Sequence, residues 1–203
     1  MKGQSINIPG IRAAVQSIFR PSLLVPVMVV PDMRSIPFVD LHKRGFKAIV
    51  FDKDNTLTAP YKNDIHPPFL SAFNECKKVF VGKVAVVSNS AGSIDDVGNK
   101  LASHLSVSLG IPIITQRDKK PLGADQLPKY FDCQPHEIIV VGDRLTTDII
   151  YGNRIGAMTI FCTNVITLEN DNPMAIKIRP IEYRVLKMLQ YFNVTNHHPL
   201  FKS

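Results

Sequence analysis

The sequence predicts an α/β protein in which a parallel sheet is covered by helices on both faces. Short apolar runs of strand length alternate along the chain with stretches of helical pattern. Strands that are buried on both faces are apolar throughout, and parallel strands need such helical connections. Several of the runs end in acidic or hydroxyl side chains, and sheets of this kind bind ligands at the carboxyl ends of their strands. We therefore expect a doubly wound, three-layer α/β/α architecture with a polar site at one edge of the sheet.

The individual elements follow from the apolar runs and from the residues that end them. Strands are expected at 48–51, 84–87, 111–114, 138–141 and 158–161, of which the last carries no polar motif. Helices are expected near 68–79, 93–109, 123–131 and 147–155. Ser93 is the expected N-cap of the second helix, and Gly110 and Gly156 are expected to end the second and the fourth.

A last amphipathic helix is expected over 180–192. Its apolar side chains recur at spacings of three and four, at Ile181, Val185, Met188, Leu189 and Phe192. Packing on the domain is the first interpretation of this stripe, and a membrane or partner face is the alternative. His197 and His198 follow in a polar tail, 196–203, and are not expected to bind a metal.

Length and composition favour one domain, placed at 36–195, in a reducing compartment. A chain of 203 residues with 45% hydrophobic content can form one well-buried core. Cys76, Cys133 and Cys162 have no paired spacing, which argues against a disulfide framework or a zinc site. The net charge of +7 indicates anionic partners, such as phosphates, nucleic acid or acidic lipid, without choosing among them.

The first 35 residues differ from the rest in charge and are treated as a separate segment. They hold no acid before Asp32, whereas Arg12 and Arg20 are basic. Acid-poor, arginine-bearing amphipathic starts resemble mitochondrial presequences. The apolar stretch 23–30 contains a proline and is too short to span a bilayer, which needs about 20 apolar residues. It is expected either to pack on the domain or to lie at a lipid interface.

The most informative stretch is Asp52-Lys53-Asp54-Asn55-Thr56, directly after an apolar run. Alternate residues of an extended strand share a face, so Asp52 and Asp54 can point at one ligand. Close carboxylates repel unless a proton or a cation lies between them, and Mg2+ prefers oxygen ligands. One carboxylate could attack phosphorus while the other moves protons. A capped turn is the purely structural alternative, because Asp and Asn favour turns.

Polar side chains also follow later apolar runs. Ser88 and Asn89 come after 84–87 and can bond a phosphoryl oxygen, although a polar turn would explain them as well. Lys119 and Lys120 offer ammonium groups for phosphate, or they form a solvated basic loop.

The run 138–141 is followed by Gly142-Asp143-Arg144 and, five residues after Asp143, by Asp148. Acids near the start of a helix also have a structural reason, since that end of a helix favours negative charge.

In their order along the chain, these stretches resemble the motifs of the haloacid dehalogenase-like phosphatases. The resemblance implies a Rossmann-like sheet of that type, with Asp52 as the nucleophile and Asp54 as general acid and base. It also implies that Ser88 and Lys120 hold the phosphoryl oxygens. Lys119 is the alternative to Lys120 in that role.

The same resemblance implies a Mg2+ ion held by Asp52, by the backbone carbonyl of Asp54 and by Asp143. Asp148 would be an outer-shell ligand or would hold Lys120. The gaps between the motifs leave no room for an inserted cap domain. An open site of this kind suits a large substrate, because the substrate or a partner surface must then exclude water.

Three features resemble the mitochondrial phosphatidylglycerophosphate phosphatase family of fungi and plants. They are the lysine beside Asp52, the two lysines before Pro121, and residues 142–149. The implied reaction is Mg2+-dependent removal of the terminal phosphate from phosphatidylglycerophosphate, which gives phosphatidylglycerol for cardiolipin synthesis. The implied place is the matrix face of the mitochondrial inner membrane, with peripheral contact to the anionic lipid surface.

Further basic residues are candidate substrate contacts. Lys43, Arg44, Lys53 and Arg144 could meet the headgroup or lipid surface, and Asn89 and Lys119 the phosphate; the charged ones could equally be ordinary solvated groups. One alternative function is a capless phosphatase of a nucleic acid 3′-phosphate or a phosphoprotein, and another is a non-enzymatic basic membrane adaptor. The chain has no aromatic and basic stripe for stacking bases, so nucleic acid is not expected as a partner.

Overall fold

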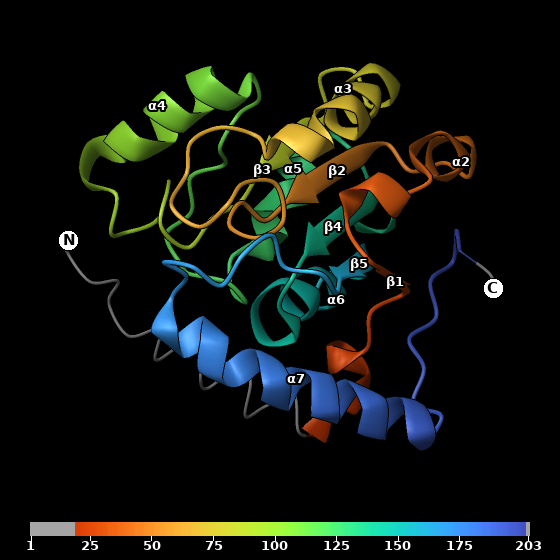
Figure 1. Ribbon diagram of the computed structural model, residues 1–203. Coiled ribbons are helices and arrows are strands. Elements are labelled where there is room, and N and C mark those ends of the chain that lie inside the picture. The colour runs from red at the N-terminus through yellow and green to blue at the C-terminus, as the bar shows by residue number, and fades with distance from the viewer. Residues whose placement is uncertain (1–18, 202–203) are drawn as a thin grey trace.

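A five-stranded parallel sheet forms the centre of the protein. The computed structural model describes residues 19–201. The strands lie in the order β1 (Met28–Val30), β5 (Met158–Cys162), β4 (Ile138–Gly142), β2 (Ala48–Phe51) and β3 (Val84–Val86). Every pair of neighbours is parallel. The prediction of a parallel sheet covered by helices is confirmed, and Figure 1 shows the helices arranged around it.

Alternate residues of each strand face opposite sides, so the sheet separates two apolar cores. Ile49 and Phe51 pack with α2 (Phe38–Lys43), α3 (Leu70–Val79) and α4 (Lys100–Leu109). Ala48 and Val50 pack on the other face with α5 (Leu127–Phe131) and α6 (Ile150–Asn153). This arrangement is the expected three-layer fold. Between β2 and β3 the chain forms only η4 (Pro67–Phe69) and α3, so this part holds no cap domain.

The strand expected at 111–114 was predicted too long, because this segment pairs with β3 at one position only. Ile113 makes a single bridge to Val86, with hydrogen bonds of 2.9 Å from Val86 N to Pro112 O and 2.8 Å from Ile114 N to Val86 O. Pro112 has no N–H to donate, which limits the pairing of this segment to one bridge.

The four helices expected between the strands are shorter than their sequence patterns. The one expected from Ser93 begins at Lys100, because Gly98 and Asn99 adopt positive φ angles of 71° and 55° that no α-helix contains. It ends as expected at Gly110, with φ 65°. The other irregular turns are η2 (Pro21–Leu24), η3 (Met33–Ser35), η5 (Val97–Asn99), η6 (Ala124–Gln126), η7 (Pro135–Glu137) and η8 (Leu145–Ile149).

The C-terminal helix α7 (Pro173–Tyr191) is longer than expected and faces differently. It begins at the N-cap Asn172, whose side chain accepts hydrogen bonds from Met174 N and Ala175 N, and Pro180 lies within it. Ile181, Met188 and Phe192 of the expected packing stripe are 56%, 52% and 67% exposed. The buried side chains are Ala175, Arg179, Glu182, Leu186 and Leu189. Of the expected stripe only Leu189 is buried, because two of the inward positions are charged.

The described part of the N-terminal segment belongs to the domain. β1 pairs with β5 as the outer strand of the sheet, and Asn153 Nδ2 donates to Leu23 O and Val25 O at 2.9 and 3.0 Å. Residues 19–35 therefore pack on the domain, which is the first of the two expected alternatives. The presequence resemblance depends on residues 1–18, which lie outside the described part.

The C-terminal tail also packs on the domain. Asn196 Nδ2 donates to Val25 O at 3.1 Å, and the buried ring of His198 lies 5.2 Å from that of Phe46. Within residues 19–201, no helix has the length and apolar character needed to cross a membrane.

Candidate active site

The site lies where the strand order reverses. From β2 the chain passes to β3 on one side and then returns to β4 on the other. Loops that leave adjacent strands in opposite directions open a crevice at their carboxyl ends. Asp52 follows β2 and Asp143 follows β4, and Asp52 N donates to Val141 O at 2.8 Å. The parallel register of β2 and β4 therefore brings the first and last motifs together.

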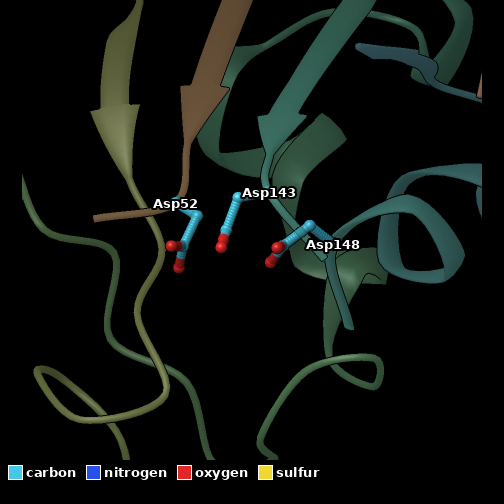
Figure 2. Close-up of side chains that lie close together, drawn as sticks. All are labelled: Asp52, Asp143 and Asp148. Carbon is cyan, nitrogen blue, oxygen red and sulfur yellow. The ribbon is translucent and has the colours of Figure 1, made fainter. Parts of the chain in front are cut away.

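Three carboxylates meet at the carboxyl ends of these strands. Asp52, Asp143 and Asp148 each place a carboxylate oxygen within 4.8 Å of the others. Figure 2 shows their side chains directed toward one another from the ends of two strands and from the turn that follows. Asp143 and Asp148 are buried, so the repulsion among the three groups is weakly screened. A hard cation with oxygen ligands fits this set of donors.

Gly142 allows Asp148 to reach the cluster. A Cβ atom at residue 142 would lie 2.3 Å from Asp148 Cβ and 2.4 Å from Asp148 Cγ, closer than atoms can approach. Arg144 N donates to Asp148 Oδ2 at 3.1 Å and fixes the carboxylate across the π-helical turn η8. The glycine before Asp143 thus has a packing reason.

Lys120 lies between two of the carboxylates. Its Nζ is 2.5 Å from Asp52 Oδ1 and 2.6 Å from Asp148 Oδ1. Burial opposes the charge of Lys120, but Asp148 and Asp52 outweigh it and raise the pKa of the ammonium above its ordinary value. Asn89 Oδ1 accepts a hydrogen bond from Lys120 N at 2.7 Å, so Asn89 positions this lysine through its backbone.

Lys119 has a different partner. Its Nζ is 2.5 Å from Asp95 Oδ2, in the loop that follows β3. Of the two neighbouring lysines, Lys120 is the one whose ammonium contacts the candidate nucleophile Asp52.

Asp54 stands beside the carboxylate cluster and has other partners. Lys53 Nζ contacts Asp54 Oδ1 at 2.5 Å, and Tyr61 N donates to the same oxygen at 2.8 Å. Burial raises the pKa of Asp54; the charge of Lys53 opposes this shift, and that of Asp52 adds to it. A raised pKa suits a carboxyl group that must first donate a proton.

The structure places Lys53 away from any exposed surface. The residue is 3% exposed, and its Nζ also donates to Lys62 O at 3.0 Å and to Thr58 Oγ1 at 3.3 Å. Its contacts make it a partner of Asp54 and of the loop after β2. The expected contact of Lys53 with a headgroup is therefore replaced by a role within the protein.

Ser88 lies at the end of the strand next to β2. It is buried, and its Oγ accepts from Ser90 N at 3.2 Å and lies 3.0 Å from Ser90 Oγ. Val87 N donates to Phe51 O at 2.9 Å, which fixes Ser88 beside the residues that follow β2. The hydroxyl is thus on the same edge of the sheet as Asp52.

Burial sets the electrostatics of the last motif. Burial, together with the negative charges of Asp52 and Asp148, raises the pKa of Asp143 to about 8. The positive charge of Arg179 opposes this shift. Burial also raises the pKa of Asp148 to about 6, where Lys120 opposes the shift. Ionising both carboxylates in this buried position costs free energy, and a bound cation would remove that cost. Asp52, Asp143 and Asp148 thus fit a divalent metal by charge as well as by distance.

Sequence reasoning missed two buried charges of α7. Arg179 Nη2 and Nε donate to Asp143 Oδ2 at 2.6 and 2.9 Å, and Nη1 donates to Asp171 Oδ2. Asp171 Oδ2 also accepts from Asn55 Nδ2 at 3.0 Å, which joins this group to the loop after β2. The apolar stripe was interpreted as the buried face of the helix, so these residues were not considered. Charged residues among the inward positions of an amphipathic helix are the signal that could have identified them.

Glu182 is the second missed charge. Its Oε2 accepts from Arg144 Nε at 2.9 Å, and its Oε1 accepts from Thr146 N at 2.9 Å and from Thr146 Oγ1. Arg144 is consequently held over the turn that carries Asp148. Instead of the expected contact with a headgroup or lipid surface, it forms an ion pair with Glu182, with side-chain exposures of 14% and 3%.

Lys43 and Arg44 lie at the wrong end of the sheet for the site. They end α2, which precedes the amino end of β2, whereas Asp52 follows its carboxyl end. Arg44 stacks its guanidinium 5.1 Å from the ring centre of Phe201. The expectation that these two residues contact the substrate headgroup is not supported by their position.

The chain is similar in sequence to known phosphatases. A family model described as mitochondrial PGP phosphatase matches residues 8–167. Phosphatidylglycerophosphate phosphatase 1 (chloroplastic/mitochondrial) of Arabidopsis thaliana is 41% identical over 188 residues, covering 91% of this chain and 54% of its own length. Mitochondrial phosphatidylglycerophosphatase GEP4 of Saccharomyces cerevisiae is 32% identical over 176 residues, 84% of this chain and 94% of its own. The chain spans about half the length of the Arabidopsis protein and of the similar Chlamydomonas reinhardtii protein, where the covered share is 52%.

Proposed function

Because the chain belongs to the mitochondrial PGP phosphatase family, we propose that it removes the terminal phosphate from phosphatidylglycerophosphate. The product would be phosphatidylglycerol, the precursor for cardiolipin synthesis. One observation carries the proposal beyond the resemblance, namely that Lys120 Nζ contacts both Asp52 and Asp148 at the point where the strand order reverses. A nucleophilic carboxylate, a fixed cation and further acids within reach are what phosphoryl transfer through an aspartyl-phosphate requires.

The first step forms a covalent intermediate. An oxygen of Asp52 bonds to phosphorus while the bond from phosphorus to the terminal glycerol oxygen breaks. Asp54, whose pKa is raised by burial, donates the proton that this oxygen needs. Phosphatidylglycerol leaves, and the phosphoryl group stays on Asp52.

The second step returns the enzyme to its starting state. Asp54, now a carboxylate, takes a proton from a water molecule that attacks phosphorus, and the bond to Asp52 breaks. Inorganic phosphate is released and Asp54 is protonated again, so both proton transfers balance. Lys120 and the hydroxyl of Ser88 hold the phosphoryl oxygens through both steps and stabilise the charge that develops on them.

A Mg2+ ion would be held by Asp52 and Asp143, together with the backbone carbonyl of Asp54. Its chemistry is to offset negative charge on the phosphoryl oxygens. Asp148 holds Lys120 at 2.6 Å, which makes it a positioning residue. Asn89 positions Lys120 from its other side, and Arg144 and Lys53 support Asp148 and Asp54 respectively.

Localisation follows the relatives. Similar proteins of plants and yeast carry mitochondrial names, and we place this chain at the matrix face of the inner membrane as a peripheral protein. Cardiolipin precursors are anionic lipids, which the positive net charge of the chain favours.

The test is Mg2+-dependent phosphate release from phosphatidylglycerophosphate in mixed micelles. A soluble phosphate ester and a 3′-phosphorylated oligonucleotide serve as competing substrates, and Asp52→Asn is the control. We expect strong preference for the lipid and a loss of turnover of roughly 10⁴-fold or more in the variant. Turnover of the soluble ester without the lipid would reject the lipid substrate and retain the chemistry. Lipid turnover by a folded Asp52→Asn would reject Asp52 as the nucleophile.

A further inference from the structure

The outer face of α7 carries large apolar side chains that nothing in the described chain covers. Met174, Ile181 and Met188 recur every seven residues and are 60%, 56% and 52% exposed. Tyr191 and Phe192, at the end of the helix, are 81% and 67% exposed. Positions seven apart lie within about 20° of each other around a helix, so these methionines and the isoleucine form one row.

A row of cations runs beside the apolar row. Lys177, Arg184 and Lys187 are exposed, and Lys177 and Arg184 are again seven residues apart. The single acid of the helix, Glu182, is buried on the opposite face against Arg144 and Thr146. The exposed surface of α7 is therefore apolar and basic, without a negative charge from the helix itself.

We propose that this face of α7 docks on the surface of an anionic lipid bilayer, the helix lying flat with its apolar row among the acyl chains. The inference rests on the proposed function, because it supplies the surface from which the lipid substrate reaches the site. Helices with one apolar and one basic row bind in the interface of membranes that contain anionic lipids. At 19 residues the helix is about 28 Å long, enough for a contact along one side of the molecule (Figure 1).

Charge distinguishes the bilayer from two other occupants. A second copy of this chain in a two-fold dimer would place the basic row against itself. The N-terminal residues 1–18 contain Lys2 and Arg12 and no acid, so they have the same sign of charge as the face they would cover. An anionic lipid surface is the complementary occupant.

The opposite face of α7 connects this surface to the site. Arg179 bonds Asp143, and Glu182 bonds Arg144 and Thr146, on the loop that carries the last motif. Docking of the outer face therefore leaves only α7, with a diameter of about 10 Å, between the lipid surface and the loop that carries Asp143.

Vesicle flotation of the full-length protein tests the proposal. The probes are vesicles of phosphatidylcholine alone and of phosphatidylcholine with phosphatidylglycerol, without substrate, so that binding is measured apart from turnover. Binding is expected only with the anionic lipid. Replacing Lys177, Arg184 and Lys187 by Gln should weaken it by roughly tenfold or more, and Ile181→Ser with Met188→Ser should weaken it as well.

Matched controls remove the same groups elsewhere. Lys43, Lys78 and Lys129 are exposed lysines of other helices, and their replacement by Gln lowers the net charge equally. Val81→Ser with Val107→Ser removes side chains that are 79% and 84% exposed. These controls should bind as the unchanged protein does. All variants should keep their thermal midpoint and their turnover of a soluble phosphate ester.

Several outcomes would overturn the proposal. Equal losses of vesicle binding in the α7 variants and the matched controls would show that binding depends on the net charge of the protein and not on this face. Loss of binding in Lys2→Gln with Arg12→Gln, while the α7 variants still bind, would assign the lipid contact to the N-terminus. A dimer that the α7 substitutions dissociate would make this face a protein interface. If wild-type protein binds the vesicles but releases no phosphate from the lipid, the proposed function fails and the docking surface stands.

Discussion

Two groups of charges in this protein have the same arrangement of signs but different origins. The inner one places Lys120 between Asp52 and Asp148, and the outer one places Arg179 between Asp143 and Asp171. Each holds one cation between two carboxylates. The inner group is assembled from residues that follow β2 and β4 and from the loop between α4 and α5. The outer group needs a helix residue 36 positions beyond Asp143.

The comparison separates chemistry from support. The ammonium of Lys120 is a point charge that contacts the nucleophile, so it can follow a phosphoryl oxygen. The guanidinium of Arg179 directs three N–H groups at two fixed carboxylates, which suits a structural clamp. Loss of the inner cation should affect the reaction most, and loss of the outer one should affect both the reaction and the fold.

The largest effect is expected when the inner group loses its cation. Lys120→Met should lower turnover by roughly 10³-fold, because a charge that stabilises the transition state is removed. Lys119→Met is the matched control one residue away and should lower turnover less than tenfold. Single-turnover phosphate release from the lipid in mixed micelles measures both. Equal losses in the two variants would mean that the contact with Asp52 does not distinguish the lysines.

A methyl group at Gly142 should break the inner group without removing any charge. Gly142→Ala would place Cβ 2.3 Å from Asp148 Cβ, so Asp148 must move away from Lys120. A displacement of this size costs about 10²-fold in turnover. Gly152→Ala is the control, since its Cβ would lie 2.6 Å from Thr159 Cγ2, within the sheet packing and away from the carboxylates. It should lower the thermal midpoint and leave turnover of the folded fraction unchanged.

Removal of the outer cation should have a mixed effect. Arg179→Met leaves Asp143 and Asp171 buried without their partner, which should lower the free energy of unfolding by about 3 kcal/mol. Turnover should fall by about 10- to 100-fold, as for other residues that orient metal ligands. Urea unfolding and the dependence of turnover on Mg2+ concentration measure the two parts. Arg179→Lys should restore part of both.

The control for Arg179 is Arg34→Met, because Arg34 pairs with Asp32 at 2.7 Å while its side chain is 55% exposed. An exposed pair contributes little, so this change should alter unfolding only slightly. A similar loss of stability in both variants would contradict the structural role assigned to the outer group.

The last expected effect concerns the dependence of Mg2+ binding on pH. The pKa of Asp143 is raised to about 8 and that of Asp148 to about 6, and a cation binds their deprotonated forms. Mg2+ affinity should therefore rise between pH 6 and pH 8, by up to about tenfold per pH unit for each proton released. Calorimetric titration in buffers of different ionisation enthalpy counts those protons. An affinity that does not change with pH would show that the carboxylates are already ionised without the metal.

The same pKa shifts predict how the metal-free protein responds to pH. In the unfolded chain these carboxyl groups titrate near pH 4, so between pH 4 and pH 8 the folded state binds more protons. The contribution of Asp143 to stability then falls as pH rises through that window. Saturating Mg2+ should abolish this trend, because metal-bound carboxylates stay ionised in the folded state, as they are in the unfolded chain.

The motifs were predictable because strand register converts sequence order into proximity. Asp52 and Asp143 each follow an apolar run, and adjacent parallel strands bring the ends of such runs together. Lys120 could not be separated from Lys119 by sequence, since both lie in the same loop. What separates them is the hydrogen bond from Lys120 N to Asn89 Oδ1, which depends on two loops meeting in space.

Other features depended on tertiary contacts that no local pattern records. β1 reads as three apolar residues within a proline-rich stretch and becomes a strand only because β5 presents an open edge. The sequence analysis assigned no role to Arg179 or Glu182, which are buried because carboxylates and N–H groups at the site satisfy them. It placed most of the helix, but of the expected packing stripe only Leu189 is buried.

The pairing of β1 with β5 has a consequence for how the chain folds. Met28 pairs with Ile160, 132 residues later, and β1 has no other neighbour in the sheet. A contact of such sequence separation forms late, because a long loop must close first. During synthesis β1 therefore emerges first and joins the sheet last. Until it does, the outer edge of β5 is exposed to pairing with other chains.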